Sequence, residues 1–310
     1  MNRITTRVQA TPILAVFAAV LVWSIGPIIT LSIEVSINTT IFYRVMFWPP
    51  LLFAIAKLRK VPITKHVMRI TFLPGIFFGL STISGFSAMK ATSIANATII
   101  GNVSTALILF VAPKFLGERV RLVQVAFAAI SFLGISAIVF GANGSGGATL
   151  RGDVYALANA VLWACYFVAC KKVRTDGVGA WAFIFGVSVA QVAVVAPWAI
   201  VTSHDLSKVS VRDIVLITLM ACITGTVGHT LIVWAQKFVP ASSSSLITLL
   251  SPVLSMIGAW LVFEQQINLV QFIGGAVVLA SLAGVVRYGT KESVNRDVLT
   301  TADPLLNSSL

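Results

Sequence analysis

The sequence predicts an all-α membrane protein in which ten transmembrane helices form two inverted five-helix repeats around a central cavity. Three observations predict this fold class: the composition, the number of membrane-length apolar segments, and a polar pattern that recurs at one sequence offset. Of the 310 residues, 57% are hydrophobic and 10% are charged, and the mean hydropathy is +0.95. A soluble domain carries about 25% charged residues, so the composition excludes that class.

Ten apolar segments are long enough to cross a bilayer, since a transmembrane helix needs about 20 apolar residues. The alternating pattern of a membrane β-barrel is missing from the sequence, which leaves a helical bundle. The expected spans are 11–31, 36–56, 70–89, 93–113, 121–141, 153–171, 179–201, 212–235, 241–261 and 268–287.

The net charge of +12 follows from membrane topology and does not indicate nucleic-acid binding. Most of the 22 lysines and arginines fall at the N-terminus and in every second connection after it. By the positive-inside rule, these connections and both chain ends are cytoplasmic. With five spans per half, the second half must enter from the opposite side, as in an inverted repeat. The expected parts are a cytoplasmic tail at 1–10, a first repeat at 11–141, an outer linker at 142–152, a second repeat at 153–287 and a cytoplasmic, disordered tail at 288–310.

A polar face recurs in the fourth and ninth expected spans. At one constant offset, Thr98 corresponds to Ser244, Asn102 to Thr248, Thr105 to Ser251, and Glu118 to Glu264. Helical spacing places the hydroxyl and amide residues of each span on one face. We interpret the two faces as opposite walls of one solute pathway; the alternative is hydrogen bonding between packed helices. Pro252 lacks an amide donor, so we expect a kink there that serves as a hinge.

Aromatic and polar residues share a face of the first and sixth spans. Trp23 and Trp163 occupy similar places in the two repeats, and the face of Trp163 also carries Asn159 and Tyr166. Rings that stack and form hydrogen bonds suit a small organic solute with an apolar part. The alternatives are an aromatic packing ridge and, for Trp23, an interfacial belt.

Two further polar residues fall within spans. Arg44 lies well inside the second span, where a charge is costly, so it is either an anchor for a substrate carboxylate or a structural arginine bonded to carbonyls. Pro49 and Pro50 are expected to break the helix just after it. His229 lies in the eighth span and is either a hydrogen-bonding core residue or a proton carrier.

The sequence lacks the signals of an enzyme or a cofactor protein. It contains no phosphate-binding Walker loop, and its three cysteines form neither a metal pattern nor a disulfide framework. The ten carboxylates lie at span ends, in connections or in the tail, so the common device for carrying a proton or sodium ion, a carboxylate buried within a span, is missing. We therefore predict no enzymatic activity, no cofactor and no metal site.

Two segments resemble a known family. Residues 85–120 read GFSAMKATSIANATIIGNVSTALILFVAPKFLGERV, and residues 233–267 read VWAQKFVPASSSSLITLLSPVLSMIGAWLVFEQQI. Both look like helical hairpins of EamA-type transporters in the drug/metabolite transporter superfamily. The resemblance covers 11–287 and implies a ten-helix inverted-repeat basket, with bacterial exporters of aromatic and neutral amino acids closest in character. The first repeat has Thr105 where the second has Ser251 and Pro252, which argues against two symmetric hinges.

The predicted function is a secondary transporter that exports small neutral or zwitterionic metabolites, above all amino acids including aromatic ones, as a facilitator or with weak coupling. Trp23, Trp163 and Tyr166 would hold the apolar part of the solute, and Arg44 or His229 would meet a carboxylate. The alternatives are a carrier of phosphorylated or nucleotide sugars, which needs several cationic clamps, and a structural membrane protein. The expected partners are a small-molecule substrate and the lipid bilayer, the expected location is a bacterial inner membrane, and the sequence makes no prediction of the oligomeric state.

Overall fold

The structure is a computed structural model that describes residues 2–92, 94–141, 149–264 and 266–289, and within these ranges every regular element is helical. Parts of the expected linker (142–148) and tail (290–310) lie outside the described residues. The first half contains α1 (Asn2–Leu31), α2 (Ile37–Leu58), α3 (Lys65–Ala91), α4 (Ile94–Leu116) and α5 (Leu122–Gly141). The helix α1 therefore begins within the expected N-terminal tail.

The second half contains shorter pieces within some spans. Its elements are α6 (Leu150–Thr175), α7 (Ala180–Thr202), the 3-10 helix η1 (Leu206–Lys208), α8 (Val211–Met220), the π-helix η2 (Ala221–Gly228), α9 (His229–Ala235), α10 (Ala241–Thr248), α11 (Ser251–Phe263), α12 (Leu269–Gly284) and the π-helix η3 (Val285–Gly289). Among the described residues, ten helical segments are long and apolar enough to cross a membrane. Their positions follow the ten spans expected from the sequence, so the fold-class prediction is confirmed.

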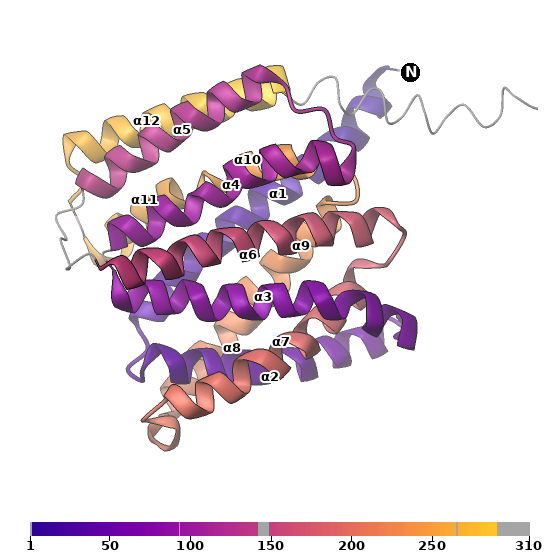
Figure 1. Cartoon of the computed structure of the whole chain (residues 1–310), viewed down its shortest axis with the longest axis vertical. Helices are drawn as coiled ribbons and strands as arrows, with labels where there is room; N and C mark the ends of the chain where they lie inside the picture. The colour runs from indigo at the N-terminus through magenta and orange to yellow at the C-terminus, as the bar shows by residue number, and fades with distance from the viewer. Residues whose placement is uncertain (1, 93, 142–148, 265, 290–310) are drawn as a thin grey trace, which may run out of the picture.

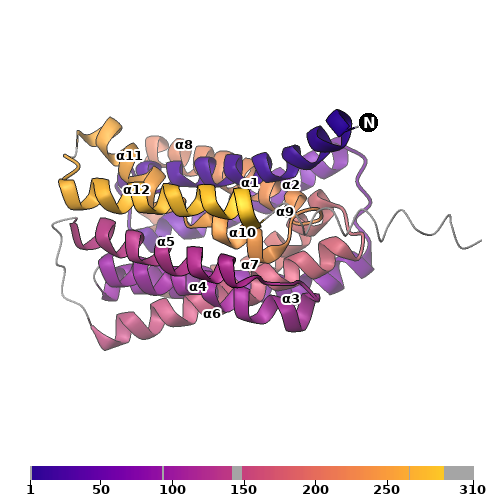
Figure 2. The ribbon, with the colours of Figure 1, turned by 90° about the horizontal axis from the view of Figure 1, so that it is seen from above.

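The packing of the two halves is reciprocal, as an inverted repeat requires. The helix α3 packs along α6, and its repeat counterpart, the span α8–η2–α9, packs along α1. In the same way, α4 packs on α6, and the span α10–α11 packs on α1. The helices α5 and α12, which close the two halves, lie along each other (Figure 1). Figure 2 shows α3, α4 and α6 on one side of the bundle and α1, α8 and α11 on the other.

Polar side chains cap the N-termini of several helices at the two faces of the bundle. Ser36, Thr64 and Thr149 accept hydrogen bonds from the first turns of α2, α3 and α6. Ser210 and Asn268 each form a reciprocal capping box at α8 and α12. Such caps satisfy backbone donors at the helix N-terminus, where no intrahelical partner exists. They help to set the ends of the spans that the apolar pattern predicts only approximately.

Of the two effects expected from prolines, one is absent and one is present. The helix α2 continues through Pro49 and Pro50, so the predicted break is wrong. A proline ring has a helical φ, and neighbouring helices can hold a transmembrane helix together where backbone hydrogen bonds are lost. In the ninth span the helix does end at Thr248 and restarts at Ser251, beside Pro252. Because Pro252 cannot donate to Thr248 O, the expected kink is present there.

Close backbone contact joins α5 to α12 at Gly134 and Gly274. An ideal Cβ on Gly274 would lie 2.6 Å from Gly134 O and 2.9 Å from Ile138 N. Both neighbours are backbone atoms and cannot rotate away, so the two helices would have to separate. Small residues at such interfaces let helices approach closely in membranes.

We expect Gly274→Ala to lower the free energy of unfolding by about 2 kcal/mol, within the usual cost of overpacking. Thermal unfolding of the detergent-purified protein measures the change. Gly179→Ala is the matched control, because no atom lies within 4 Å of the position of its Cβ. Equal melting temperatures for the two variants would contradict the close contact.

Candidate functional site

Aromatic side chains from both halves meet near the middle of the bundle. We call this group the aromatic cluster. The first half contributes one ring each from α1, α2 and α3, and the second half contributes rings from α6 and α9. Its members are Trp23, Trp48, Phe78, Trp163, Tyr166 and His229.

The rings form one connected set. The Trp23 and Trp163 centroids lie 5.9 Å apart with planes at 71°, an edge-to-face arrangement. Phe78 stacks on Tyr166 at 4.8 Å and lies 6.0 Å from Trp163. These are favoured geometries for aromatic pairs. Phe78 and Tyr166 are buried while Trp23 and Trp163 are half-buried, so the two indoles form the more accessible edge of the cluster.

His229 is the polar centre of the cluster. Its Nε2 and Tyr166 Oη lie 2.5 Å apart in a hydrogen bond, and both side chains are buried. The imidazole also contacts Trp23 at 5.8 Å, Trp48 at 5.5 Å and Phe78 at 4.9 Å. The structure therefore brings together four residues that the sequence predicted for one site: Trp23, Trp163, Tyr166 and His229.

A π-helical segment adjoins this site. The element η2 precedes His229 and packs against both α1 and α2. Its wide turns leave Thr224 O as the acceptor for the N–H of Trp23, at 3.2 Å, while Thr226 Oγ donates back five residues to Ala221 O at 3.0 Å. Short π-helical segments are frequent at functional sites.

Arg44 belongs to the surroundings of the cluster. It lies on α2 one turn before Trp48, which is a member of the cluster. Among the described residues, the half-buried Arg44 makes no hydrogen bond or ion pair. In the described part of the chain, Arg44 therefore does not form the bonds to carbonyl groups that its structural interpretation requires.

The predicted polar residues of α4 and α6 lie apart from the rings. The Asn102 amide donates to Thr98 O in its own helix at 2.8 Å. Asn159 Oδ1 accepts from Ser81 Oγ at 2.7 Å, and its side chain packs close to Gly85. Asn159 therefore joins α6 to α3.

The predicted residues of the ninth span lie where α10 meets α4. Thr105 Oγ donates to Ser245 O at 3.3 Å, so the polar faces of α4 and α10 are in contact at these residues. Thr248 Oγ also donates to Ser245 O, at 2.6 Å, and Ser244 Oγ is buried with no hydrogen-bond partner among the described residues. Ser251 is half-buried at the start of α11. Beyond this point α11 packs chiefly against α1.

At one end of the bundle, hydrogen bonds to Glu118 join the two halves. We call this end the basic end, because it carries the connections 57–69, 114–121 and 171–178. Glu118, after α4, caps α10: its carboxylate accepts from Ala241 N at 2.6 Å, from Ser242 N at 3.0 Å and from Ser242 Oγ at 2.8 Å. Nearby, Lys171 Nζ donates to Val239 O at 3.0 Å. An anionic cap at a helix N-terminus satisfies free N–H groups and interacts favourably with the helix dipole.

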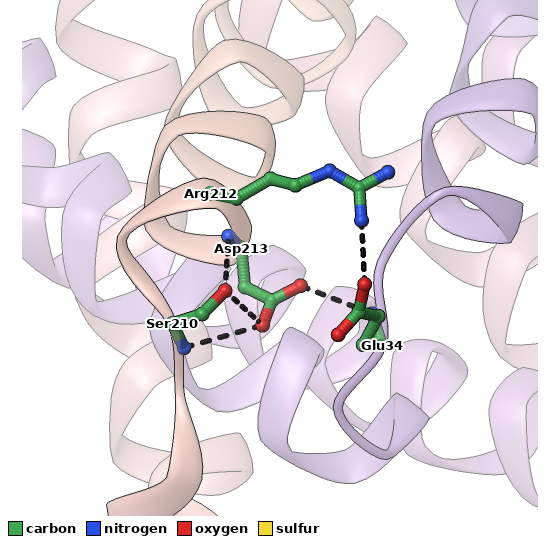
Figure 3. Close-up of polar contacts among 4 residues, drawn as sticks. All are labelled: Glu34, Ser210, Arg212 and Asp213. Carbon is green, nitrogen blue, oxygen red and sulfur yellow. Dashed lines mark hydrogen bonds and ion pairs between the residues drawn. The ribbon is translucent and has the colours of Figure 1, made fainter.

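The opposite end has separate polar contacts (Figure 3). Asp213 accepts from Glu34 N at 3.0 Å and from Ser210 Oγ at 2.7 Å, and the exposed Arg212–Glu34 pair lies beside it at 2.6 Å. These bonds tie the connection after α1 to the start of α8. Glu264, the repeat counterpart of Glu118, is exposed at this end.

Asp205, in the connection after α7, is a further anchor at the opposite end. Burial favours its neutral form, but hydrogen bonds from Thr39 and Ser36 outweigh burial and hold its pKa below the usual value. Because the folded-state pKa is lowered, this carboxylate stabilises the fold above its unfolded-state pKa, and the contribution disappears as the pH falls through the folded-state pKa.

The sequence analysis missed Trp48, Phe78 and the capping role of Glu118. Trp48 follows Arg44 by four residues, and this helical spacing was a usable signal. Phe78 has no such signal among the apolar residues of α3. Glu118 was recognised as a repeated carboxylate, but its partners lie more than 120 positions away.

Comparisons with known proteins agree with this architecture. The model of the EamA-like transporter family matches residues 10–140 and again residues 150–287. A solved structure described as "Crystal structure of protein" has a TM-score of 0.74 and 20% identity, covering 87% of this chain and 95% of that chain. This likeness shows the fold alone. No curated protein matches the sequence. The matches confirm the resemblance found in the sequence: the chain belongs to the EamA-like transporter family and is a membrane transporter of small molecules.

Proposed function

We propose that the protein is a secondary transporter that exports small neutral or zwitterionic metabolites, above all amino acids including aromatic ones, by alternating access. The observation that carries the proposal is the aromatic cluster, in which Trp23 and Trp163 from equivalent spans of the two halves meet edge to face. A site shared by both halves changes its accessibility when one half rocks against the other.

The side chains suggest a division of roles. Trp23, Trp163 and Tyr166 contact the apolar part of the substrate, and Arg44 or His229 meets its carboxylate. The hydroxyl and amide groups along α4, α10 and α11 contact its polar end during passage. The amide of Asn159 holds α6 against α3. These polar groups are Thr98, Asn102, Thr105, Ser244, Thr248 and Ser251. The interruption of the ninth span beside Pro252 supports a hinge there.

We further propose that the basic end and both termini face the cytoplasm of a bacterial cell, with the chain in the inner membrane. The concentration of lysine and arginine in the connections of this end supports that orientation. In this arrangement the Glu118 cap closes the cytoplasmic end. A release of the cap would then admit solute from inside.

The test uses purified protein in liposomes preloaded with radiolabelled tryptophan, threonine or alanine. We expect efflux of at least one amino acid above that of protein-free liposomes. An imposed pH gradient separates a facilitator, which is indifferent to it, from a proton-coupled carrier, for which His229 and Tyr166 are the candidates. Failure of folded protein to move any amino acid would overturn the assignment and direct the assay to sugars and nucleosides.

A further inference from the structure

The indole N–H of Trp48 is a buried donor without a hydrogen-bond partner in the described part of the chain. The Trp48 side chain is 4% exposed and lies inside the aromatic cluster, 5.5 Å from His229 and 6.0 Å from Phe78. Its Nε1 has no hydrogen-bond acceptor among the residues that the structure describes, whereas the N–H of Trp23 is bonded to Thr224 O. Buried donors in folded proteins are nearly always paired, so an unpaired one in a transport site calls for an explanation.

Arg44 presents a second set of donors on the same face of α2. The two residues are four positions apart, which places their side chains one above the other on the helix. This face looks toward η2 and α9: an ideal Cβ on Gly225 would lie 3.3 Å from Trp48 Nε1, and the Trp48 ring lies 5.5 Å from that of His229. The guanidinium is half-buried and, among the described residues, has no ion-pair or hydrogen-bond partner.

We propose that Arg44 and Trp48 together bind the carboxylate of the transported substrate and make the carrier selective for carboxylic acids over their amides and amines. The Arg44 guanidinium balances the charge, and the Trp48 N–H donates to one carboxylate oxygen. This assignment rests on the transport function proposed above and adds the group that the substrate must carry.

The chemistry of the two donors favours a carboxylate over other anions. A guanidinium pairs well with a carboxylate, because its N–H groups match the two oxygens. A phosphate ester carries up to two charges and is usually held by several cations. The neighbouring rings of Phe78 and Tyr166 then suit an apolar or aromatic group attached to the acid.

The first arm of the test needs no substitution. Competition against efflux is measured with each amino acid that the wild-type protein moves, with its carboxamide, and with the amine that lacks the carboxyl group (for tryptophan: tryptophanamide and tryptamine). We expect the amide and the amine to compete at least about tenfold more weakly than the acid, because they lose a charge-assisted hydrogen bond. Equal competition by acid and amide would overturn the inference while leaving amino-acid transport in place.

The second arm uses Trp48→Phe, which retains a ring and removes the N–H. We expect the KM for the acid to rise by about tenfold while the weak competition by the amide stays unchanged. Arg44→Gln should act in the same selective way, and Trp181→Phe, at the basic end over Arg59, is the matched control. Thermal unfolding of each variant in detergent identifies any that fails to fold, in which case the wild-type competition decides.

The outcomes separate the two proposals. No transport of any amino acid would remove the proposed function and this inference together. Transport with an unchanged KM in a folded Trp48→Phe variant would remove the Arg44–Trp48 pair alone.

Discussion

Replacement of Trp163 by leucine is expected to lower kcat/KM for aromatic substrates by about tenfold or more. Trp163 contacts Trp23, Phe78 and Tyr166 at centroid distances of 5.9, 6.0 and 5.5 Å and lies at the accessible edge of the cluster. Aromatic pairs contribute about 0.5–1.5 kcal/mol each beyond the area they bury, and 1.4 kcal/mol is a factor of ten. A substrate ring that stacks on Trp163 would lose this interaction.

The measurement is efflux from liposomes together with thermal unfolding, because loss of a half-buried ring also affects stability. Trp181→Leu is the matched control: its ring packs against Arg59 at the basic end, 5.1 Å from the guanidinium carbon. We expect the control to lose stability with little change in KM. Normal transport of aromatic substrates by Trp163→Leu would show that the cluster is a packing ridge, which was the alternative drawn from the sequence.

The second large effect is expected from Glu118→Ala. The substitution removes three hydrogen bonds to Ala241 and Ser242 and leaves the N-terminus of α10 without its anionic cap. Loss of such a cap costs about 2 kcal/mol, or roughly a thirtyfold change in the population of the closed basic end. Glu118→Gln should have a smaller effect, because the amide oxygen can still accept one of these bonds.

The opening is measured at Ser243, which is fully buried under the cap. A single cysteine at this position, in a protein whose Cys165, Cys170 and Cys222 have been replaced, reports access by a membrane-impermeant maleimide. We expect faster labelling when Glu118→Ala is added. Glu264→Ala is the matched control, since the same carboxylate of the other repeat is exposed at the opposite end. Labelling that does not change in Glu118→Ala would refute the closure.

Equivalent residues of the two hairpins make different contacts, although their sequences are similar. The sequence contains two repeats, as predicted, but a constant offset from Thr98 to Ser244 and from Glu118 to Glu264 does not make equivalent residues behave alike. Glu118 is bonded to α10, while Glu264 is exposed. The difference arises because the two ends of the bundle are packed differently: α10 begins beside Glu118 and donates to its carboxylate, whereas the side chain of Glu264 is exposed.

The sequence by itself determined the transmembrane spans and predicted their orientation, because these features depend on the local properties of each segment. Hydrophobicity over about 20 residues marked the ten spans, and the placement of lysine and arginine indicated their alternation. A transmembrane helix satisfies its own backbone hydrogen bonds, so its existence depends little on its neighbours. The same reasoning found Trp23, Trp163, Tyr166 and His229, because polar and aromatic residues stand out within an apolar helix.

Only the tertiary structure decided which of these residues meet. Asn159 is bonded to Ser81 and lies outside the aromatic cluster, whereas Trp48 lies within it. A helix carries residues on all of its faces, and its rotation in the bundle selects the face that turns inward. That rotation follows from packing against helices more than a hundred positions away, including the close contact of Gly134 with Gly274, and no local pattern contains this information.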